Sequence, residues 1–195
     1  MFILPPDSVL NAYKRGYFPM ADSSEDDAPI YWYTAQLRGI IPIDSFHISK
    51  RSLRYFKKFG YKPAINKNVR QVIEQCGNQE PAWINPVIRD TYTYLHELGY
   101  VHSVEVHQNG ELVGGLYGLR LGSAFFAESV FQSEPEAHKA ALYFCYEILK
   151  KNGFTLWDVQ FQTDHLTQFG CVEIPAKKYS KILKEALSSP DLPFE

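Results

Sequence analysis

Residues 101–131 read VHSVEVHQNGELVGGLYGLRLGSAFFAESVF, and this stretch constrains the fold more than any other. It contains three runs rich in β-branched and aromatic residues, at 101–107, 112–119 and 123–131, and Asn109-Gly110 stands between the first two. Asn-Gly is typical of two-residue hairpin turns because both residues tolerate positive φ angles. The stretch therefore predicts three successive antiparallel strands.

A helix and another strand are expected directly after these runs. Residues 135–151 repeat small and apolar side chains at helical spacing, and the strand-like FTLWDVQF follows at 154–161. Three strands, a helix and a strand predict an α+β fold with a mainly antiparallel sheet and flanking helices. This is also the order of N-acetyltransferase-like (GNAT-type) acyltransferases, in which neighbouring central strands separate and open a cleft. We therefore expect a GNAT-type catalytic domain over residues 66–195.

The preceding residues, 1–65, predict a smaller N-terminal domain of mixed structure. A short helix capped by Asp7-Ser8 leads into an acidic loop, and residues 31–46 look extended. Ser49 is suited to cap a helix over 50–59 that ends at Gly60. The residues expected to face inward from this helix are Leu53, Phe56 and Phe59.

The composition is that of a globular protein. Of its 195 residues, 45% are hydrophobic and 22% are charged, and no apolar run approaches the roughly 20 residues of a membrane-spanning helix. The N-terminus MFILPPDS has no signal-peptide pattern. The three cysteines have neither a disulfide nor a metal-binding spacing. We expect a cytoplasmic protein with reduced cysteines and no membrane partner.

Basic residues are concentrated in one short segment. Residues 47–70 hold eight Lys and Arg and no acidic residue, although the whole chain has a net charge of −2. Such a local excess indicates a polyanionic partner, because a merely soluble surface mixes the two signs. The alternative is an ordinary solvated helix face. The residues that would share one face of the helix over 50–59 are Lys50, Arg54, Lys57 and Lys58.

The sequence contains no strong pattern for a metal or a cofactor. Glu105 and His107 share one strand face but lack a third ligand. Coenzyme A enzymes bind pyrophosphate with a glycine-rich turn that opens a helix. Nothing before the helix over 135–151 has that pattern, and the glycines at 114, 115 and 118 lie inside a predicted strand. We therefore expect no metal and no cofactor.

Eight sequence blocks occur in the order found in one known family. They are YKRGYFPM (13–20), RGIIP (38–42), FHISKRSLR (46–54), HSVEVH (102–107), LVGGLYGL (112–119), FFAESVF (125–131), DVQFQTDH (158–165) and GCVEIP (170–175). These blocks resemble those of leucyl/phenylalanyl-tRNA–protein transferases. The resemblance implies that Leu or Phe, with Met as a further candidate, is moved from aminoacyl-tRNA to a protein that begins with Arg or Lys. The product would be a degradation signal.

The resemblance also implies catalytic roles for three residues. Gln160 would accept a hydrogen bond from the attacking amine through its side-chain carbonyl. Asp158, two residues earlier on the same strand face, would orient and polarise that amide. Glu128 would face the incoming basic terminus or the amine of the donor. The alternatives are a structural hydrogen-bond pair for Asp158 and Gln160 and a solvated carboxylate for Glu128.

Other positions match those that contact substrates in the family. Phe125 matches a position in the pocket for the aminoacyl side chain, and the basic face of the helix over 50–59 matches the surface for the tRNA acceptor stem. Met20 stands where the family usually has an aromatic residue, Ala127 where Gly is common, and Thr163 where Asn is frequent, so the resemblance leaves the donor preference open. The implied substrate-binding residues are Tyr13, Met20, Trp83, Tyr92, Phe125 and Ala127.

Two alternatives stay open at the level of sequence. One is a coenzyme A-dependent N-acyltransferase on a similar fold, which the missing pyrophosphate turn disfavours. The other is a non-catalytic tRNA-binding adaptor that has kept the basic face. The expected partners of a transferase are aminoacyl-tRNA and proteins with an N-terminal Arg or Lys, without DNA, and nothing in the sequence requires more than a monomer.

Overall fold

The computed structural model describes residues 3–79 and 82–195, and in these residues seven strands form one sheet. Their order is β4-β5-β6-β7-β8-β3-β9, and β7 and β8 pair in parallel while the other neighbours pair antiparallel. The predicted α+β class with a mainly antiparallel sheet is therefore confirmed. The strands are β3 (Leu37–Ile40), β4 (Lys62–Ile65), β5 (Val101–Gln108), β6 (Glu111–Leu121), β7 (Ala124–Gln132), β8 (Leu156–Gln160) and β9 (Val172–Pro175).

The predicted hairpin lies between β5 and β6. Asn109 and Gly110 have φ angles of 52° and 90°, the left-handed conformation that both central residues of a tight hairpin turn adopt. The chain then continues through β7 into helix α5 (Ala137–Asn152). Because α5 crosses back over the sheet, β8 can pair with β7 in the parallel sense. The order of elements predicted for residues 101–161 is confirmed.

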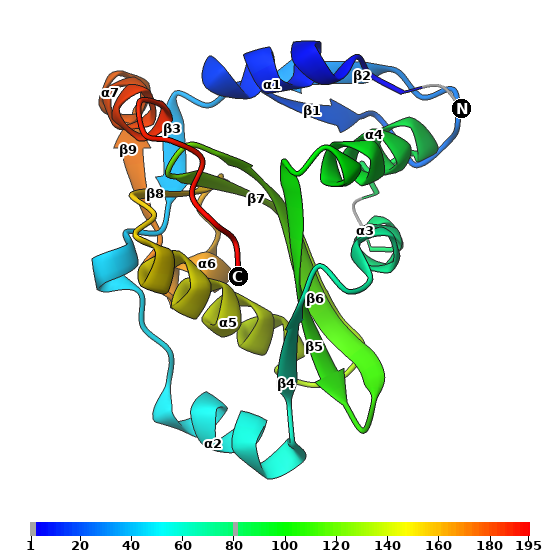
Figure 1. Cartoon of the computed structure of the whole chain (residues 1–195), viewed down its shortest axis with the longest axis vertical. Coiled ribbons are helices and arrows are strands. Elements are labelled where there is room, and N and C mark those ends of the chain that lie inside the picture. Colours follow the sequence, from blue (N-terminus) through cyan, green and yellow to red (C-terminus); the bar gives the residue numbers. More distant parts are fainter. Residues whose placement is uncertain (1–2, 80–81) are drawn as a thin grey trace.

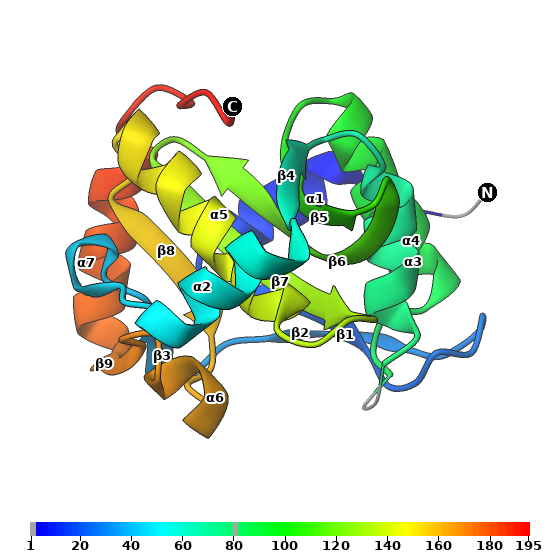
Figure 2. The same cartoon turned by 90° about the horizontal axis from the view of Figure 1, so that it is seen from below.

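Helices cover both faces of the sheet (Figure 1). On one face, α2 (Lys50–Phe59) and α5 enclose a core that includes Phe125 (Figure 2). On the other face lie α1 (Pro6–Lys14), α3 (Val69–Gly77), α4 (Pro86–Glu97) and α7 (Ala176–Leu187). Phe126 belongs to this second core, so Phe125 and Phe126, which are neighbours on β7, point to opposite faces of the sheet.

Residues 31–46 do not form the single extended segment expected from the sequence. They divide between β2 (Ile30–Tyr33), β3 and the short helix η1 (Ile43–Ser45). β2 pairs with β1 (Phe18–Ala21) in a two-stranded ribbon beside α1 (Figure 1), whereas β3 joins the large sheet between β8 and β9. The local sequence does not show which strand β2 or β3 pairs with, because that choice depends on packing against residues that are distant in the chain.

Two details of the predicted helices are corrected. In α2 the Ser49 hydroxyl accepts the Ser52 N–H at 3.0 Å and Gly60 closes the helix at a φ of 69°, as predicted, but Phe59 is exposed and stacks on Tyr55 at 4.2 Å. In α1 the helix begins with Pro at its first position and has no side-chain cap, so Asp7-Ser8 does not cap it.

The predicted boundary at residue 65 stays a prediction. β3 and β4 both precede that boundary, and both belong to the seven-stranded sheet of the described residues, so a separate N-terminal domain is not shown. A short helix, α6 (Asp164–Thr167), connects β8 with β9. Given their length and hydropathy, none of the helices in the described part of the chain could cross a lipid bilayer.

Candidate active site

A cavity lies where β7 and β8 separate. The two strands pair at only three positions, from Ala124 opposite Leu156 to Phe126 opposite Asp158, and each then continues without the other. Glu128 and Gln160 lie just beyond the last pair. The cavity measures about 210 Å³, and its lining residues are Phe18, Met20, Trp83, Glu128, Val159, Gln160, Phe161, Thr163 and Leu166.

A β-bulge directs Glu128 into this cavity. Tyr117 on β6 lies opposite Ser129 and Gly118 lies opposite Ala127, which leaves Glu128 as an extra residue without a partner. Bulges re-aim side chains in this way, often beside functional sites. A side chain at position 118 would bring its Cβ within 2.4 Å of the Phe126 carbonyl oxygen, so the close approach of the strands here requires glycine.

Glu128 joins a chain of four polar side chains. The Gln160 amide donates from Nε2 to Glu128 Oε1 at 3.2 Å, and the Tyr92 hydroxyl donates to Glu128 Oε2 at 3.4 Å. The hydroxyls of Tyr92 and Tyr13 are hydrogen-bonded to each other, and both tyrosines are fully buried. The structure therefore brings together four of the residues singled out from the sequence, and they come from α1, α4, β7 and β8.

Burial determines the direction in which the pKa values of Glu128 and Tyr92 shift. The pKa of Glu128 is raised to about 8, because desolvation and the nearby Asp158 carboxylate raise it by more than the Tyr13 and Tyr92 hydrogen bonds and the Arg38 charge lower it. Desolvation also raises the pKa of Tyr92 well above its usual value. A carboxyl group with a pKa near working pH can both take up and release a proton.

Asp158 lies behind the cavity in a different network. Its carboxylate accepts from Arg38, from the Tyr179 hydroxyl at 2.5 Å, and from the backbone N–H of Gln160 at 2.9 Å. Gln160 itself has a φ of 58°, which turns its backbone out of the strand conformation. Asp158 is therefore hydrogen-bonded to the backbone of Gln160. The side-chain amide that it was expected to orient is hydrogen-bonded to Glu128 instead.

The other residues predicted to contact substrate divide into two groups. Met20, Trp83 and Thr163 line the cavity, although Thr163 also caps α6 by accepting the Leu166 N–H at 3.1 Å. Phe125 and Ala127 are not brought to the cavity, because both pack on the face of the sheet that carries α5. Phe125 is fully buried there and stacks on Phe194, with ring centroids 4.8 Å apart.

Comparisons with known proteins identify the family. Residues 40–184 match the model of the leucyl/phenylalanyl-tRNA protein transferase family, and residues 3–36 match the model of its N-terminal domain. The chain belongs to this family. A leucyl/phenylalanyl-tRNA–protein transferase of Ruegeria pomeroyi is 42% identical over 185 residues, which are 95% of this chain and 88% of the relative. One from Cereibacter sphaeroides is 44% identical, covering 95% of this chain and 86% of that one.

Solved structures offer only distant likenesses. L-PGS from Bacillus licheniformis aligns with 83% of this chain and 55% of its own at 15% identity, with a TM-score of 0.44. A likeness of this strength has no bearing on function. Family membership, in contrast, makes the chain a transferase that uses aminoacyl-tRNA.

The four basic residues expected to meet tRNA lie on the exposed face of α2. Lys50, Arg54, Lys57 and Lys58 are all exposed, whereas Phe56 points into the core against α5. Figure 2 shows α2 and α5 in front of the sheet, so this cationic face lies on the side of the sheet opposite to α1. Exposure is what a contact with phosphate groups requires.

Several residues of the site were not recognised from the sequence. Arg38 and Tyr179 hold Asp158, and Phe18 and Phe161 line the cavity. Arg38 had one signal, because a single arginine inside an apolar, strand-like segment must find a partner when it is buried. Tyr179 had none, since it lies on α7 among four lysines.

No metal-binding cluster accompanies the site in the described residues, where no group of three or more His, Cys, Asp or Glu side chains is suitably arranged. Glu105, which shares a strand face with His107, accepts the backbone N–H of Asn68 at 2.6 Å and the Ser103 hydroxyl at 2.9 Å. It thus anchors the start of α3. The three cysteines are buried and unpaired with one another.

Proposed function

We propose that the protein transfers Leu or Phe from aminoacyl-tRNA to the N-terminal Arg or Lys of an acceptor protein, at the cavity between β7 and β8. The observation that supports this most directly is the Glu128–Gln160 hydrogen bond of 3.2 Å at the polar end of a cavity whose other walls are mainly apolar. An apolar wall suits the donor side chain, and the polar pair suits an amine.

The size of the cavity favours an amino-acid side chain as its occupant. Its volume of about 210 Å³ lies below the roughly 300–1,000 Å³ of sites that enclose whole small molecules. The apolar part of its wall comes from Phe18, Met20, Trp83, Val159 and Leu166. Met20 is unbranched and adaptable, so it suits a site that must accept both Leu and Phe.

The reaction exchanges an ester for an amide. The amine nitrogen attacks the ester carbonyl carbon, a C–N bond forms, the bond to the ribose oxygen breaks, and the proton of the amine ends on that oxygen. An α-amine with a pKa of about 7.7–8.0 is neutral in a substantial fraction near pH 7.5. The Glu128 carboxylate, with a pKa of about 8, takes the proton as the amine becomes cationic and returns it to the leaving oxygen.

Gln160 holds the amine in position for this step. Its Nε2 donates to Glu128, and its side-chain carbonyl is therefore directed to accept from the attacking amine. Asp158 acts on Gln160 through the backbone, by accepting the Gln160 N–H at the end of β8. Much of the rate enhancement then comes from orientation, because the ester is already an activated acyl donor.

The sheet is of the GNAT type in this proposal, on the strength of its strand order and of the separation of β7 from β8 beyond Phe126. Coenzyme A is nevertheless a poor candidate donor. Enzymes of that class bind pyrophosphate at the start of the helix equivalent to α5. Here Glu136 precedes α5, and its carboxylate accepts from Ser52 Oγ at 2.7 Å and from Lys139 Nζ at 2.6 Å.

The donor RNA binds the cationic face of α2 in this scheme. Lys50, Arg54, Lys57 and Lys58 contact phosphates of the acceptor stem, while the unpaired 3′ end reaches the cavity, where Trp83 offers a ring for stacking. Such contacts are largely independent of base sequence. The enzyme acts as a monomer in the cytoplasm, and the extended acceptor is marked for degradation.

A transfer assay tests the proposal. The protein is incubated with radiolabelled Leu-, Phe- and Met-tRNA and with peptides that begin with Arg, Lys, Asp or Ala. We expect transfer of Leu and Phe to the Arg and Lys peptides, loss of at least about a hundredfold in rate with Glu128→Gln, and no loss with the matched exposed variant Glu134→Gln. Tight tRNA binding without any transfer would support the adaptor instead.

A further inference from the structure

The ribbon of β1 and β2 presents two different faces. Phe18 lies opposite Tyr33 and Met20 lies opposite Tyr31, whereas Pro19 lies opposite Trp32. Residues directly opposite each other in an antiparallel pair project to the same side. Phe18 and Met20 line the cavity, so Tyr31 and Tyr33 lie on the cavity side of the ribbon.

Three exposed rings adjoin the cavity. Phe161 lines it, and Tyr31 and Tyr33 lie opposite the lining residues Met20 and Phe18 on the ribbon. Tyr31, Tyr33 and Phe161 are 50%, 39% and 46% exposed. Phe18 connects two of them, since its ring centroid is 6.3 Å from that of Tyr33 and 5.7 Å from that of Phe161. We call these three residues the aromatic rim. Exposed aromatic surface gathered in one place is a common mark of a site that binds a partner.

The two segments that carry the aromatic rim contain acidic residues and no Lys or Arg. Residues 17–33, which include the ribbon, contain four acidic residues and no Lys or Arg. Residues 152–176, which include Phe161, also contain no Lys or Arg. This setting attracts a cation and repels the phosphates of RNA.

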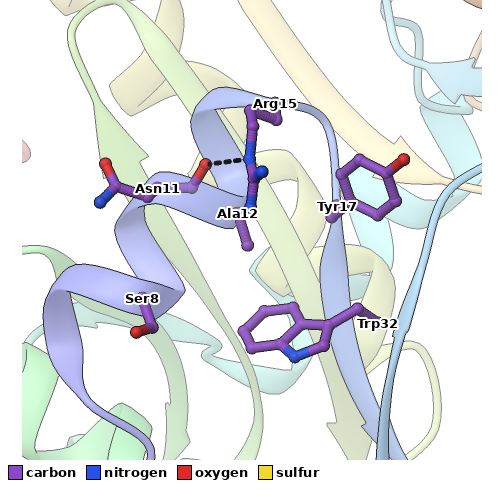
Figure 3. Close-up of a pocket in the computed structure, with 6 residues that line it drawn as sticks. All are labelled: Ser8, Asn11, Ala12, Arg15, Tyr17 and Trp32. Carbon is purple, nitrogen blue, oxygen red and sulfur yellow. Dashed lines mark hydrogen bonds between the residues drawn. The ribbon is translucent and has the colours of Figure 1, made fainter.

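The opposite face of the ribbon lies beside a positive charge, that of Arg15. There Trp32 overlies a hollow of about 460 Å³ against α1, with Arg15 and Tyr17 beside it (Figure 3). The Arg15 guanidinium donates only to the Asn11 carbonyl oxygen in the described part of the chain, at 3.3 Å, and has no carboxylate partner there. A cationic ligand is therefore favoured on the cavity side of the ribbon and disfavoured on the side of α1.

We propose that the aromatic rim binds the first residue of the acceptor polypeptide, with the cationic side chain of its Arg or Lys over the rings of Tyr31 and Tyr33 and its α-amine directed to Glu128. This deepens the proposed function and rests on it. Cations bind over aromatic faces within about 6 Å of the ring centroid, and tyrosine is among the better partners. Acceptor and donor then approach from different surfaces, the acceptor over the ribbon and the RNA over α2.

The test compares acceptor and donor kinetics in the double variant Tyr31→Ala/Tyr33→Ala. We expect the KM for a peptide beginning with Arg to rise about tenfold, because two cation–π contacts are lost, while the KM for Leu-tRNA and kcat stay within about twofold. Tyr31→Phe/Tyr33→Phe keeps the rings and restores the wild-type KM. Trp32→Ala, on the other face of the same strand, is the matched control and leaves the peptide KM unchanged.

Equilibrium binding separates this inference from the proposed reaction. A fluorescent peptide beginning with Arg is titrated with the protein in the absence of any donor, and a peptide beginning with Gln serves for comparison. Preference for Arg that disappears in Tyr31→Ala/Tyr33→Ala supports the aromatic rim even if no transfer occurs. An unchanged peptide affinity in an actively transferring variant overturns it, and a raised KM for Leu-tRNA alone would assign the rim to RNA.

Discussion

Arg38 and Asp158 form an ion pair that is withdrawn from solvent, with Nε 2.9 Å from Oδ1 and Nη2 2.9 Å from Oδ2. The two side chains are 1% and 0% exposed although the residues are 120 positions apart in the chain. Phe18 and Tyr179 cover the guanidinium with their rings, at 4.8 and 4.7 Å. The pair therefore connects β3, β8, α7 and the ribbon behind the cavity, and it fixes the backbone from which Gln160 projects.

Removing the carboxylate should cost stability as well as activity. Asp158→Ala leaves the Arg38 guanidinium buried without its partner, and the loss of one member of a buried pair costs about 3–5 kcal/mol. For a chain of this length we expect the melting temperature to fall by about 10 °C, measured by circular dichroism. Glu173→Ala, which removes an exposed carboxylate from the adjacent sheet edge, should change it little.

An unchanged melting temperature would assign a different role to Asp158. If Asp158→Ala kept the wild-type melting temperature but lost transfer, the carboxylate would act in the chemistry. Tyr179→Phe gives an independent view, because it removes the 2.5 Å hydrogen bond and keeps the ring over Arg38. We expect this variant to lower kcat with little change in the KM for Leu-tRNA.

Glu128 should make the stability of the protein depend on pH. Burial raises its pKa from 4.5 to about 8, so its contribution to stability is fully present below pH 4.5 and is lost as pH rises towards 8. Glu128→Gln stays neutral throughout. We therefore expect the free energy of unfolding of the variant, relative to that of the wild type, to increase by about 2 kcal/mol or more between pH 5 and pH 8.5, measured by urea unfolding. Glu134→Gln, which is exposed, provides the control, and parallel curves for Glu128→Gln and wild type would exclude the raised pKa.

Local patterns predicted the elements that local interactions determine. Asn109-Gly110, the Ser49 cap and the αL conformation of Gly60 all depend on neighbours within four residues, and each is confirmed. Glu128, Tyr13 and Gln160 lie in the family blocks and Tyr92 matches a family position outside them, and the structure joins all four in one hydrogen-bonded chain. The resemblance to the family could identify these residues together because a family pattern includes positions that are distant in the sequence and close in the fold.

Features that depend on distant pairing could not be predicted. The bulge at Glu128 shifts the register of β7, and no sequence period marks the extra residue. β3 enters the sheet next to β8, so the partner of Arg38 is specified by the fold and not by its neighbours. Gly39 allows this, because a Cβ there would lie 2.5 Å from the Phe161 carbonyl carbon.

The lysines of α2 should control RNA affinity and leave the chemistry intact. If about four phosphates are neutralised, the logarithm of the affinity should fall with log salt at a slope near −3 to −4. Lys57→Ala/Lys58→Ala removes two of these charges, so we expect a slope shallower by about 2, measured by filter binding of Leu-tRNA at several salt concentrations. Saturating donor should restore kcat.

The matched control removes the same charge elsewhere. Lys177 and Lys178 are adjacent, exposed lysines on α7. Lys177→Ala/Lys178→Ala should leave the slope unchanged if α2 alone carries the contact. Equal effects of the two double variants would mean that net charge, and not the face of α2, governs binding.

Met20 should set the choice between donors. Its side chain lines the cavity together with Trp83 and Gln160, and Met20→Ala enlarges that cavity. A bulky ring still fills the larger cavity, whereas Leu loses contacts, and a loss of this kind costs about tenfold or more in kcat/KM. We therefore expect transfer of Leu to fall about tenfold relative to Phe, measured with the two charged tRNAs in competition. Ile30→Ala loosens the same ribbon without changing the cavity wall, so a similar shift in that variant would count against Met20 as the determinant.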